Sequence, residues 1–271
     1  MARAPRERGR PPVLKKYGQH FLTDTRILGA IVDALAPSLT DTVVEVGPGR
    51  GSLTDILVER SGRLVGIEID RALAEQLGER YQSRSNVQIV QGDVLETDIH
   101  ALAGPDFLLI GNVPYYITTP IVFKALEPPI PRRSVFLVQR EVAERMAARA
   151  DTEAYGALSV NVGAVADVDH VMNVSAAAFQ PPPKVESAVV RLTPRATPLV
   201  GRESLPAFRA FVQAAFGLRR KQMQRVLRTV RGISPEEASG LLERAGIDSA
   251  ARPEVLSPEG FAALFELLKG N

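Results

Sequence analysis

The fold of this chain is decided by the stretch Thr42-Val43-Val44-Glu45-Val46-Gly47-Pro48-Gly49-Arg50-Gly51. A short run rich in β-branched residues, which favour strands, leads directly into a turn rich in glycine. Leu53, Ile56 and Leu57 then recur at helical spacing. A strand, a glycine turn and a helix in this order open a nucleotide-binding βαβ unit, so the sequence predicts an α/β domain with a parallel sheet.

The spacing of the glycines indicates which cofactor the turn binds. A dinucleotide fingerprint reads G-x-G-x-x-G, whereas this chain reads G-x-G-x-G from Gly47 to Gly51, with Ser52 where the third glycine would stand. A cofactor without a pyrophosphate does not need the close approach of the backbone that a third glycine would allow. The next predicted strand, Leu64–Ile69, carries Glu68 at its carboxyl end, where a carboxylate can accept both hydroxyls of a ribose. We therefore predict S-adenosylmethionine rather than NAD as the cofactor.

Two more predicted strands end on polar residues. Val87–Val90 leads to Asp93, which is either a turn aspartate or an acceptor for the adenine amino group of the cofactor. Phe107–Ile110 leads to the turn Gly111-Asn112-Val113-Pro114-Tyr115. Ligands of open α/β sheets bind at the carboxyl ends of the strands, so we expect Glu68, Asp93 and Asn112 to face one pocket.

The turn from Gly111 to Tyr115 carries the predicted chemistry. The ring of Tyr115 can stack on a planar base. The side-chain oxygen of Asn112 and a backbone carbonyl near Pro114 can accept the two N–H groups of an adenine amino group, which favours the pyramidal, more nucleophilic form of that nitrogen. Pro114 stiffens the turn and so preorganises the acceptors. The alternative is an ordinary turn between a strand and a helix, because Asn and Pro are common turn residues.

The remaining predicted elements complete one domain and begin another. They are helices at Thr25–Ala36, Arg71–Tyr81, Ile121–Leu126, Glu141–Ala150 and Tyr155–Val165, a strand at Val135–Val138, and a hairpin of Val168–Val174 with Ala188–Leu192. Phe179 precedes a proline-locked loop and is either a packing residue or an aromatic wall opposite Tyr115. Thr193–Arg202, with two prolines, is predicted as a linker, and the residues after it show only helical patterns.

Composition excludes several classes of protein. Hydrophobic residues make up 45% of the chain and charged residues 24%, which is ordinary for a globular protein. No apolar run approaches the length of a membrane span and the N-terminus lacks the apolar core of a signal peptide, so we expect a cytoplasmic protein. The chain has no cysteine for a disulfide, a thiol nucleophile or a metal site. Its three histidines, His20, His100 and His170, are scattered and do not predict a metal centre.

Positive charge is concentrated in two segments. Residues 1–16 carry a net charge of +5 and residues 217–231 carry +6, whereas the whole chain carries +2, so the rest of it carries −9. Basic segments on an acidic body fit a polyanion, and the near absence of acids in both segments favours nucleic acid over a merely solvated surface. We expect Lys221, Arg225 and Arg228 on one helix face, opposite an apolar stripe. The predicted RNA-binding residues are Arg219, Arg220, Lys221, Arg225 and Arg228.

The chain resembles the ribosomal RNA adenine N6,N6-dimethyltransferase family, specifically its small-subunit branch. The matching blocks follow one another almost from end to end, and in this order and spacing they are highly specific. They are Lys16–Leu22, Glu45–Gly51, Ile67–Asp70, Gln91–Asp93, Gly111–Tyr115, Gln139–Ala143, Tyr155–Val160, Phe179–Val189, Arg219–Lys221 and Leu256–Phe261.

This resemblance implies a Rossmann-like S-adenosylmethionine-dependent methyltransferase domain at residues 16–195. A flexible basic arm at residues 1–15 precedes it, and a small all-helical RNA- or ribosome-binding domain at residues 196–271 follows it. The implied reaction methylates the N6 groups of two adjacent adenosines near the 3′ end of 16S rRNA, in the immature 30S subunit, by a monomeric enzyme with a role in ribosome biogenesis. The positions that match the family's cofactor site are His20, Leu22, Gly47, Glu68, Asp93 and Asn112. Those that match its target-adenine site are Asn112, Tyr115 and Phe179.

Three positions depart from the family pattern: His20 replaces asparagine, Val113 replaces leucine or isoleucine, and Gly163 replaces glutamine. Two other functions stay open. The large-subunit antibiotic-resistance methyltransferases share the N-terminal motifs, although the blocks Phe179–Val189 and Leu256–Phe261 favour the small-subunit branch. The protein can also act chiefly as a ribosome-assembly binding factor, with methylation secondary.

Overall fold

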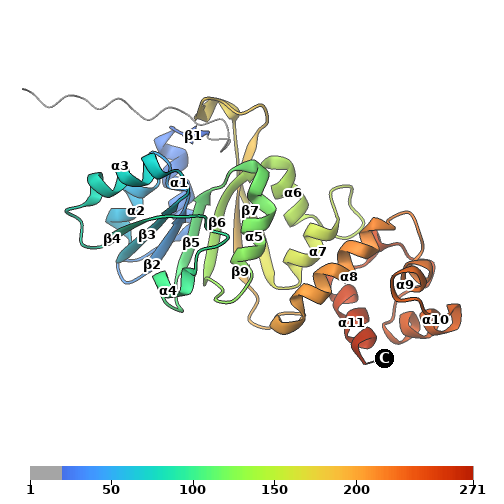
Figure 1. Ribbon diagram of the computed structural model, residues 1–271. Coiled ribbons are helices and arrows are strands. Elements are labelled where there is room, and N and C mark those ends of the chain that lie inside the picture. The colour runs from blue at the N-terminus through green and yellow to red at the C-terminus, as the bar shows by residue number, and fades with distance from the viewer. Residues whose placement is uncertain (1–19, 271) are drawn as a thin grey trace, which may run out of the picture.

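The structure is a computed structural model that describes residues 20–270. The basic arm predicted for residues 1–15 lies outside the described residues. Figure 1 shows a sheet with helices on both of its faces and a group of helices at the C-terminal end. Within residues 20–270, no helix is both long and apolar enough to cross a membrane.

The centre of the fold is a sheet of seven strands. They are β2 (Thr42–Val46), β3 (Arg63–Glu68), β4 (Val87–Gln91), β5 (Leu108–Asn112), β6 (Arg133–Gln139), β7 (Ala166–Val174) and β9 (Ser187–Pro194). Their order across the sheet is β4-β3-β2-β5-β6-β9-β7. The strands from β4 to β6 run parallel, and β9 is antiparallel to both of its neighbours. The predicted α/β class and the predicted hairpin are therefore confirmed, with a bulge in the hairpin between His170 and Met172.

Helices cover both faces of this sheet (Figure 1). One face packs against α1 (Thr25–Leu35), α2 (Thr54–Arg60) and α3 (Arg71–Tyr81), and the other against α4 (Ile99–Ala103), α5 (Thr118–Ala125) and α6 (Arg140–Ala147). Because side chains alternate along a strand, Val43 belongs to the apolar core under the first group of helices and Val44 to the core under the second. Both faces are buried, which is why the strands are almost continuously apolar.

The chain reverses its direction across the sheet next to β2. From β2 it moves outward through β3 to β4, and it then returns to β5 on the other side of β2. In open α/β sheets, ligands bind in the crevice that forms at such a switch point, outside the carboxyl ends of the strands. Gly47 follows β2 and Asn112 ends β5, so both residues lie at this crevice.

A separate two-stranded ribbon lies beside the crevice. It pairs β1 (Phe21–Leu22) with β8 (Phe179–Gln180), so that Leu22 lies opposite Phe179. Thr23 extends the pairing by donating to the carbonyl of Ala178, from its backbone N–H at 2.9 Å and from its hydroxyl at 3.1 Å. The ribbon therefore ties the proline-rich loop to the beginning of the described chain.

The C-terminal part of the chain is helical. It contains α8 (Leu205–Gly217), α9 (Met223–Arg231), α10 (Pro235–Arg244) and α11 (Pro258–Lys269). The short helix α7 (Ala157–Gly163) packs against β7 on one side and against α8 and α11 on the other. Buried apolar residues continue from the sheet into these helices, where the rings of Phe208 and Phe265 meet edge to face with centroids 5.4 Å apart. The all-helical ending is confirmed, and the domain boundary after residue 195 stays a prediction.

Several predicted boundaries are wrong by a few residues. Helix α5 already begins at Thr118, and α7 is shorter than predicted at both ends. Helix α6 ends at Ala147, because the backbone of Ala148 turns to an extended conformation with ψ of 142°. Strand β9 continues to Pro194, so the predicted linker begins inside a strand.

The structure shows a close contact at Gly163. Gly163 ends α7 where that helix meets α11, and a Cβ there would lie 3.0 Å from Cγ of Pro258, the first residue of α11. A Cβ at this position would require the Pro258 ring to shift by a few tenths of an ångström. The two helices are therefore in close contact at this glycine.

Candidate active site

A cavity opens at the crevice between β2 and β5. It has an empty volume of about 990 Å³, part of it open to solvent. Within residues 20–270, no group of three or more metal-ligating side chains could hold a metal ion, at this cavity or elsewhere. Tyr115 lines the cavity together with all six residues predicted to bind the cofactor, His20, Leu22, Gly47, Glu68, Asp93 and Asn112.

The glycine turn forms one wall of the cavity. Gly47, Gly49 and Gly51 have positive φ angles of 64°, 60° and 84°. Other residues rarely adopt this conformation, and a Cβ on Gly49 would lie 3.1 Å from the ring of Phe21. The turn therefore brings backbone rather than side chains toward a ligand.

Glu68 connects β3 to this turn. Its side chain is 3% exposed, and its two carboxylate oxygens accept from the backbone N–H groups of Gly49, at 2.8 Å, and Asp70, at 2.9 Å. Burial raises the pKa of Glu68 above its usual range, against the opposing effect of these two hydrogen bonds. Each oxygen has a second lone pair, so Glu68 can still accept hydrogen bonds from a ribose.

Asp93 and Asn112 each keep one oxygen for a ligand. Oδ1 of Asp93 accepts from the N–H of Leu95 at 2.9 Å, and Nδ2 of Asn112 donates to the carbonyl of His20 at 2.9 Å. Only the NH₂ group of asparagine can donate to a carbonyl, so this bond fixes the orientation of the amide. Oδ2 of Asp93 and Oδ1 of Asn112 receive no hydrogen bond from any residue between 20 and 270.

The acceptor predicted near Pro114 is not the carbonyl of Pro114 itself. That carbonyl already accepts from the N–H of Ile117 at 3.1 Å and from the hydroxyl of Thr118 at 3.4 Å. These two donors use both of its lone pairs. The carbonyl of Val113 has no donor in the described part of the chain, so a carbonyl next to Pro114 is available to a ligand.

Tyr115 is held beside Asn112 by two contacts. Its hydroxyl lies 2.6 Å from Oγ of Ser187, and its ring stacks on that of His20, with centroids 5.9 Å apart and 23° between the planes. His20 is itself fixed, because its Nδ1 donates to the carbonyl of Pro181 at 2.9 Å. A half-buried aromatic ring is thus positioned next to an available amide oxygen.

Comparison with known proteins shows the family. A family model described as "Ribosomal RNA adenine dimethylase" matches residues 13–269. The chain belongs to this family of ribosomal RNA adenine dimethylases. A curated relative from Bacillus mycoides, named ribosomal RNA small subunit methyltransferase A, is 39% identical over 94% of this chain and 90% of its own length. A relative of the same name from Bacillus cereus is 38% identical with the same coverage, so the family resemblance of the sequence is confirmed.

Two solved structures share the fold of this dimethylase. A dimethyladenosine transferase from Plasmodium falciparum has a TM-score of 0.77 and 26% identity, covering 92% of this chain and 98% of its own. The 23S rRNA methyltransferase ErmE has a TM-score of 0.72 and 29% identity, covering 92% and 99%. These similarities confirm a Rossmann-like methyltransferase fold with a helical C-terminal part.

The structure does not bring Phe179 into the cavity of the dimethylase. Its side chain is 4% exposed and belongs to the same apolar core as Leu22 and Ile31. The ring is covered because β8 pairs with β1. Of the two alternatives predicted for Phe179, this conformation matches the packing residue and not an aromatic wall opposite Tyr115.

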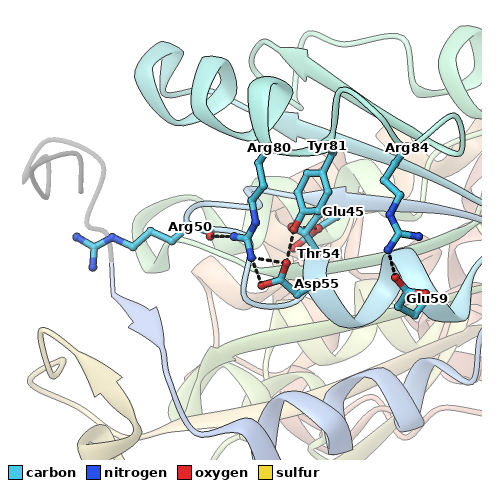
Figure 2. Close-up of polar contacts among 8 residues, drawn as sticks. All are labelled: Glu45, Arg50, Thr54, Asp55, Glu59, Arg80, Tyr81 and Arg84. Atoms are coloured by element: carbon cyan, nitrogen blue, oxygen red, sulfur yellow. Dashed lines mark hydrogen bonds and ion pairs between the residues drawn. The ribbon is translucent and has the colours of Figure 1, made fainter. Parts of the chain in front are cut away.

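Sequence reasoning missed Glu45 as a residue of the site. Its side chain is 1% exposed, lines the cavity from β2 and accepts from the hydroxyl of Thr54 at 2.8 Å (Figure 2). Burial raises the pKa of Glu45 to about 8, an effect that the Thr54 hydrogen bond opposes and the nearby charge of Glu68 favours. The signal that could have found it is a lone carboxylate in an otherwise apolar strand.

Glu45 should make the stability of the ligand-free dimethylase depend on pH. A carboxyl with a higher pKa in the folded than in the unfolded protein stabilises the fold fully below its unfolded pKa of 4.5, and this stabilisation is lost as the pH rises through about 8. The loss amounts to at most about 1.4 kcal/mol per pH unit. Urea unfolding of the wild type and of Glu45→Gln, at pH values from about 5 to about 8, measures the effect. As the pH rises, the free energy of unfolding of the wild type should fall relative to that of Glu45→Gln. A difference that stays constant with pH would contradict the prediction.

Behind the glycine turn, a polar network joins α2 to α3 (Figure 2). The guanidinium of Arg80 donates to both carboxylate oxygens of Asp55 at 2.6 Å and to the carbonyl of Arg50 at 3.3 Å. The hydroxyl of Tyr81 donates to the same carboxylate at 2.5 Å. The backbone of the turn is therefore held in place from the side opposite the cavity.

The predicted RNA-binding residues lie around the turn between α8 and α9, and all of their side chains are exposed. Arg225 and Arg228 lie on α9, whereas Lys221 lies before it, because α9 begins only at Met223. The prediction of one helix carrying all three charges is therefore wrong for Lys221. Arg219 forms an ion pair with Glu254 at 3.3 Å, while the other four predicted residues have no ion pair within residues 20–270.

Proposed function

We propose that this dimethylase transfers methyl groups from S-adenosylmethionine to the N6 atoms of two adjacent adenosines near the 3′ end of 16S rRNA, within an immature 30S subunit in the cytoplasm. The observation that carries the proposal is the available Oδ1 of Asn112 beside the fixed ring of Tyr115, in the cavity behind the glycine turn. Relatives named for the small subunit, at 39% and 38% identity, support the choice of target.

The cavity fits S-adenosylmethionine in its charge and its polar groups. Glu45 and Glu68 are buried carboxyls with raised pKa values, and a cationic ligand beside them would favour their ionised forms. S-adenosylmethionine carries such charge on its sulfonium and ammonium groups. Glu68 can accept from its ribose hydroxyls, and Oδ2 of Asp93 from its adenine amino group. When bound, the sulfonium supplies a methyl group that is already activated for transfer.

The chain's own residues position the target amino group. Oδ1 of Asn112 and the carbonyl of Val113 accept its two N–H groups, while the ring of Tyr115 stacks on the base once that base has left the RNA stack. The Asn112 acceptor is preorganised, because the amide is already bonded to the carbonyl of His20. Asn112 does not act as a base, and the proton leaves to water after transfer. Holding the amino group in line with the methyl group supplies most of the catalysis.

Transfer of labelled methyl groups to immature small subunits, followed by mapping of the modified nucleotides, tests this function. We expect two adjacent dimethylated adenosines near the 3′ end of 16S rRNA. Label on other nucleotides, or no label in the small subunit, would overturn the proposed target.

A large-subunit target is the second candidate, because ErmE, a 23S rRNA methyltransferase, is 29% identical to this chain. We favour the small subunit, since relatives named for it are 39% identical. The same assay with immature large subunits separates the two.

A role chiefly in ribosome assembly is distinguished from catalysis by comparing a folded, inactive variant with a deletion of the protein. The inactive variant would retain an assembly role but not methylation, whereas the deletion would lose both.

Replacing Glu68 by alanine should weaken binding of S-adenosylmethionine by about 1–3 kcal/mol, the range for hydrogen bonds to charged groups. Isothermal calorimetry measures the affinity. Glu59→Ala, which removes an exposed carboxylate on α2, is the matched control. An unchanged affinity in folded Glu68→Ala would remove Glu68 from the cofactor site.

Tyr115 should act through its ring and not through its hydroxyl. Tyr115→Phe should stay substantially active, whereas Tyr115→Ala should bind RNA more weakly by roughly 1–3 kcal/mol, the value of stacking one base. Tyr115→Phe also loses the hydrogen bond to buried Ser187, so its free energy of unfolding should fall by about 1 kcal/mol. The dependence of methyl transfer on RNA concentration, together with urea unfolding, measures both effects. Equal loss of activity in the two variants would assign the role to the hydroxyl instead.

A further inference from the structure

Tyr116 is exposed although the residues on both sides of it line the cavity. Its side chain is 60% exposed, and Tyr115 and Ile117 are both part of the cavity lining. Among residues 20–270 the other large exposed apolar residues are aliphatic, Leu39, Val171, Val185 and Val255. Of these two consecutive aromatic rings, that of Tyr115 therefore lines the cavity and that of Tyr116 is exposed outside it.

The backbone that carries Tyr116 is fixed on both sides. Residues Tyr115–Ile117 form a 3₁₀ turn that closes with the N–H of Ile117 donating to the carbonyl of Pro114 at 3.1 Å. The hydroxyl of Tyr115 is tied to Ser187 of β9. A ring on a backbone held in this way loses little conformational freedom when a ligand stacks on it.

The loop that leads into Ser187 carries a positive charge. Lys184 is exposed and has no ion pair within residues 20–270. Ser187 follows it by three positions and contacts Tyr115 directly. The charge of Lys184 is therefore available to a phosphate of a bound strand.

We propose that the ring of Tyr116 stacks on the base of the nucleotide next to the one held in the cavity. This inference rests on the proposed function, because it needs an adenosine bound at Tyr115. When that adenosine leaves the stack, its neighbour loses a stacking partner, which costs a few kcal/mol. An aromatic ring at the rim offers a replacement surface and offsets part of this cost.

Single-turnover methylation of immature small subunits at saturating S-adenosylmethionine tests the proposal with Tyr116→Ala and Tyr116→Phe. Tyr116→Ala should raise the half-saturating subunit concentration by roughly 5- to 150-fold, the range for one stacked base. Tyr116→Phe should match the wild type. Leu39→Ala removes another exposed apolar side chain, 72% exposed. Leu39 precedes the amino end of β2 and so lies at the opposite edge of the sheet, and its replacement should change nothing. Cofactor affinity, measured by calorimetry, should be the same in all variants.

A second measurement identifies the stacking partner. A synthetic RNA with two adjacent adenosines is compared with the same RNA lacking the base of the neighbouring nucleotide, by fluorescence anisotropy with S-adenosylhomocysteine bound. Removing that base should weaken binding to the wild type but not to Tyr116→Ala, because the interaction is already absent there. Equal weakening in both proteins, or a Tyr116→Ala variant that matches the wild type, would overturn the proposal. Failure of the wild type to methylate small subunits would instead overturn the proposed target.

Discussion

Asn112→Ala should methylate RNA about 10²-fold more slowly than the wild type, or slower still, if its oxygen is worth as much as an oxyanion-hole group. The amide holds one N–H of the target amino group and so favours the nucleophilic form of that nitrogen. Asn112→Asp should fall between the wild type and Asn112→Ala, because a carboxylate can accept the same hydrogen bond but repels the carbonyl of His20. Single-turnover methylation at saturating RNA and cofactor is the measurement, since it separates the chemical step from binding and release.

Two controls make this result specific. Asn112 also lines the cofactor cavity, so the affinity of each variant for S-adenosylmethionine must be known. Asn86→Ala is the matched substitution, because Asn86 likewise donates its amide N–H to a backbone carbonyl, that of Val58 at 3.2 Å, but lies at the amino end of β4. If Asn112→Ala transfers methyl groups near the wild-type rate with the cofactor site filled, the acceptor mechanism is wrong.

The parts of the fold that the sequence predicted are those with local signals. The strand Thr42–Val46 and the helix Arg71–Tyr81 were predicted to the residue, because a β-branched run before glycines and a helical pattern each act within a few positions. The joint location of Glu68, Asp93 and Asn112 then follows from geometry. Parallel strands place their carboxyl ends at one edge of a sheet, so predicting the strands also predicted the pocket.

The parts that the sequence did not reveal depend on contacts between distant segments. The nitrogen of His20 bonds to the carbonyl of Pro181, 161 positions away, and the ribbon formed there buries Phe179. The use of the Pro114 carbonyl by Ile117 and Thr118 depends on the tightness of the turn, which a proline alone does not specify. No apolar or polar pattern encodes such pairings, so the sequence left two alternatives for Phe179 and did not specify which carbonyl near Pro114 stays available.

Replacing Lys221, Arg225 and Arg228 together by alanine should weaken binding of immature small subunits by about 10²-fold at low salt, because each charge pair is worth about 1 kcal/mol in water. The slope of log affinity against log salt should fall by about one unit, or slightly less, for each lost phosphate contact. None of the three forms an ion pair within residues 20–270, so their charges are not already neutralised by an acid there. Affinity for S-adenosylmethionine should not change, because α9 lies far from the strands that form the cavity (Figure 1).

A charge-matched triple variant decides whether α9 makes specific contacts. Arg60, Arg71 and Arg84 lie on and next to α2 and α3, at the other end of the molecule (Figure 1), and each is paired with an acid. Replacing them by alanine removes the same net charge, yet should leave the salt slope nearly unchanged. An equal decrease in both triple variants would mean that net charge alone attracts the RNA. An unaltered slope in the α9 variant would mean that this surface is only solvated, and the RNA contacts would then have to come from other basic residues.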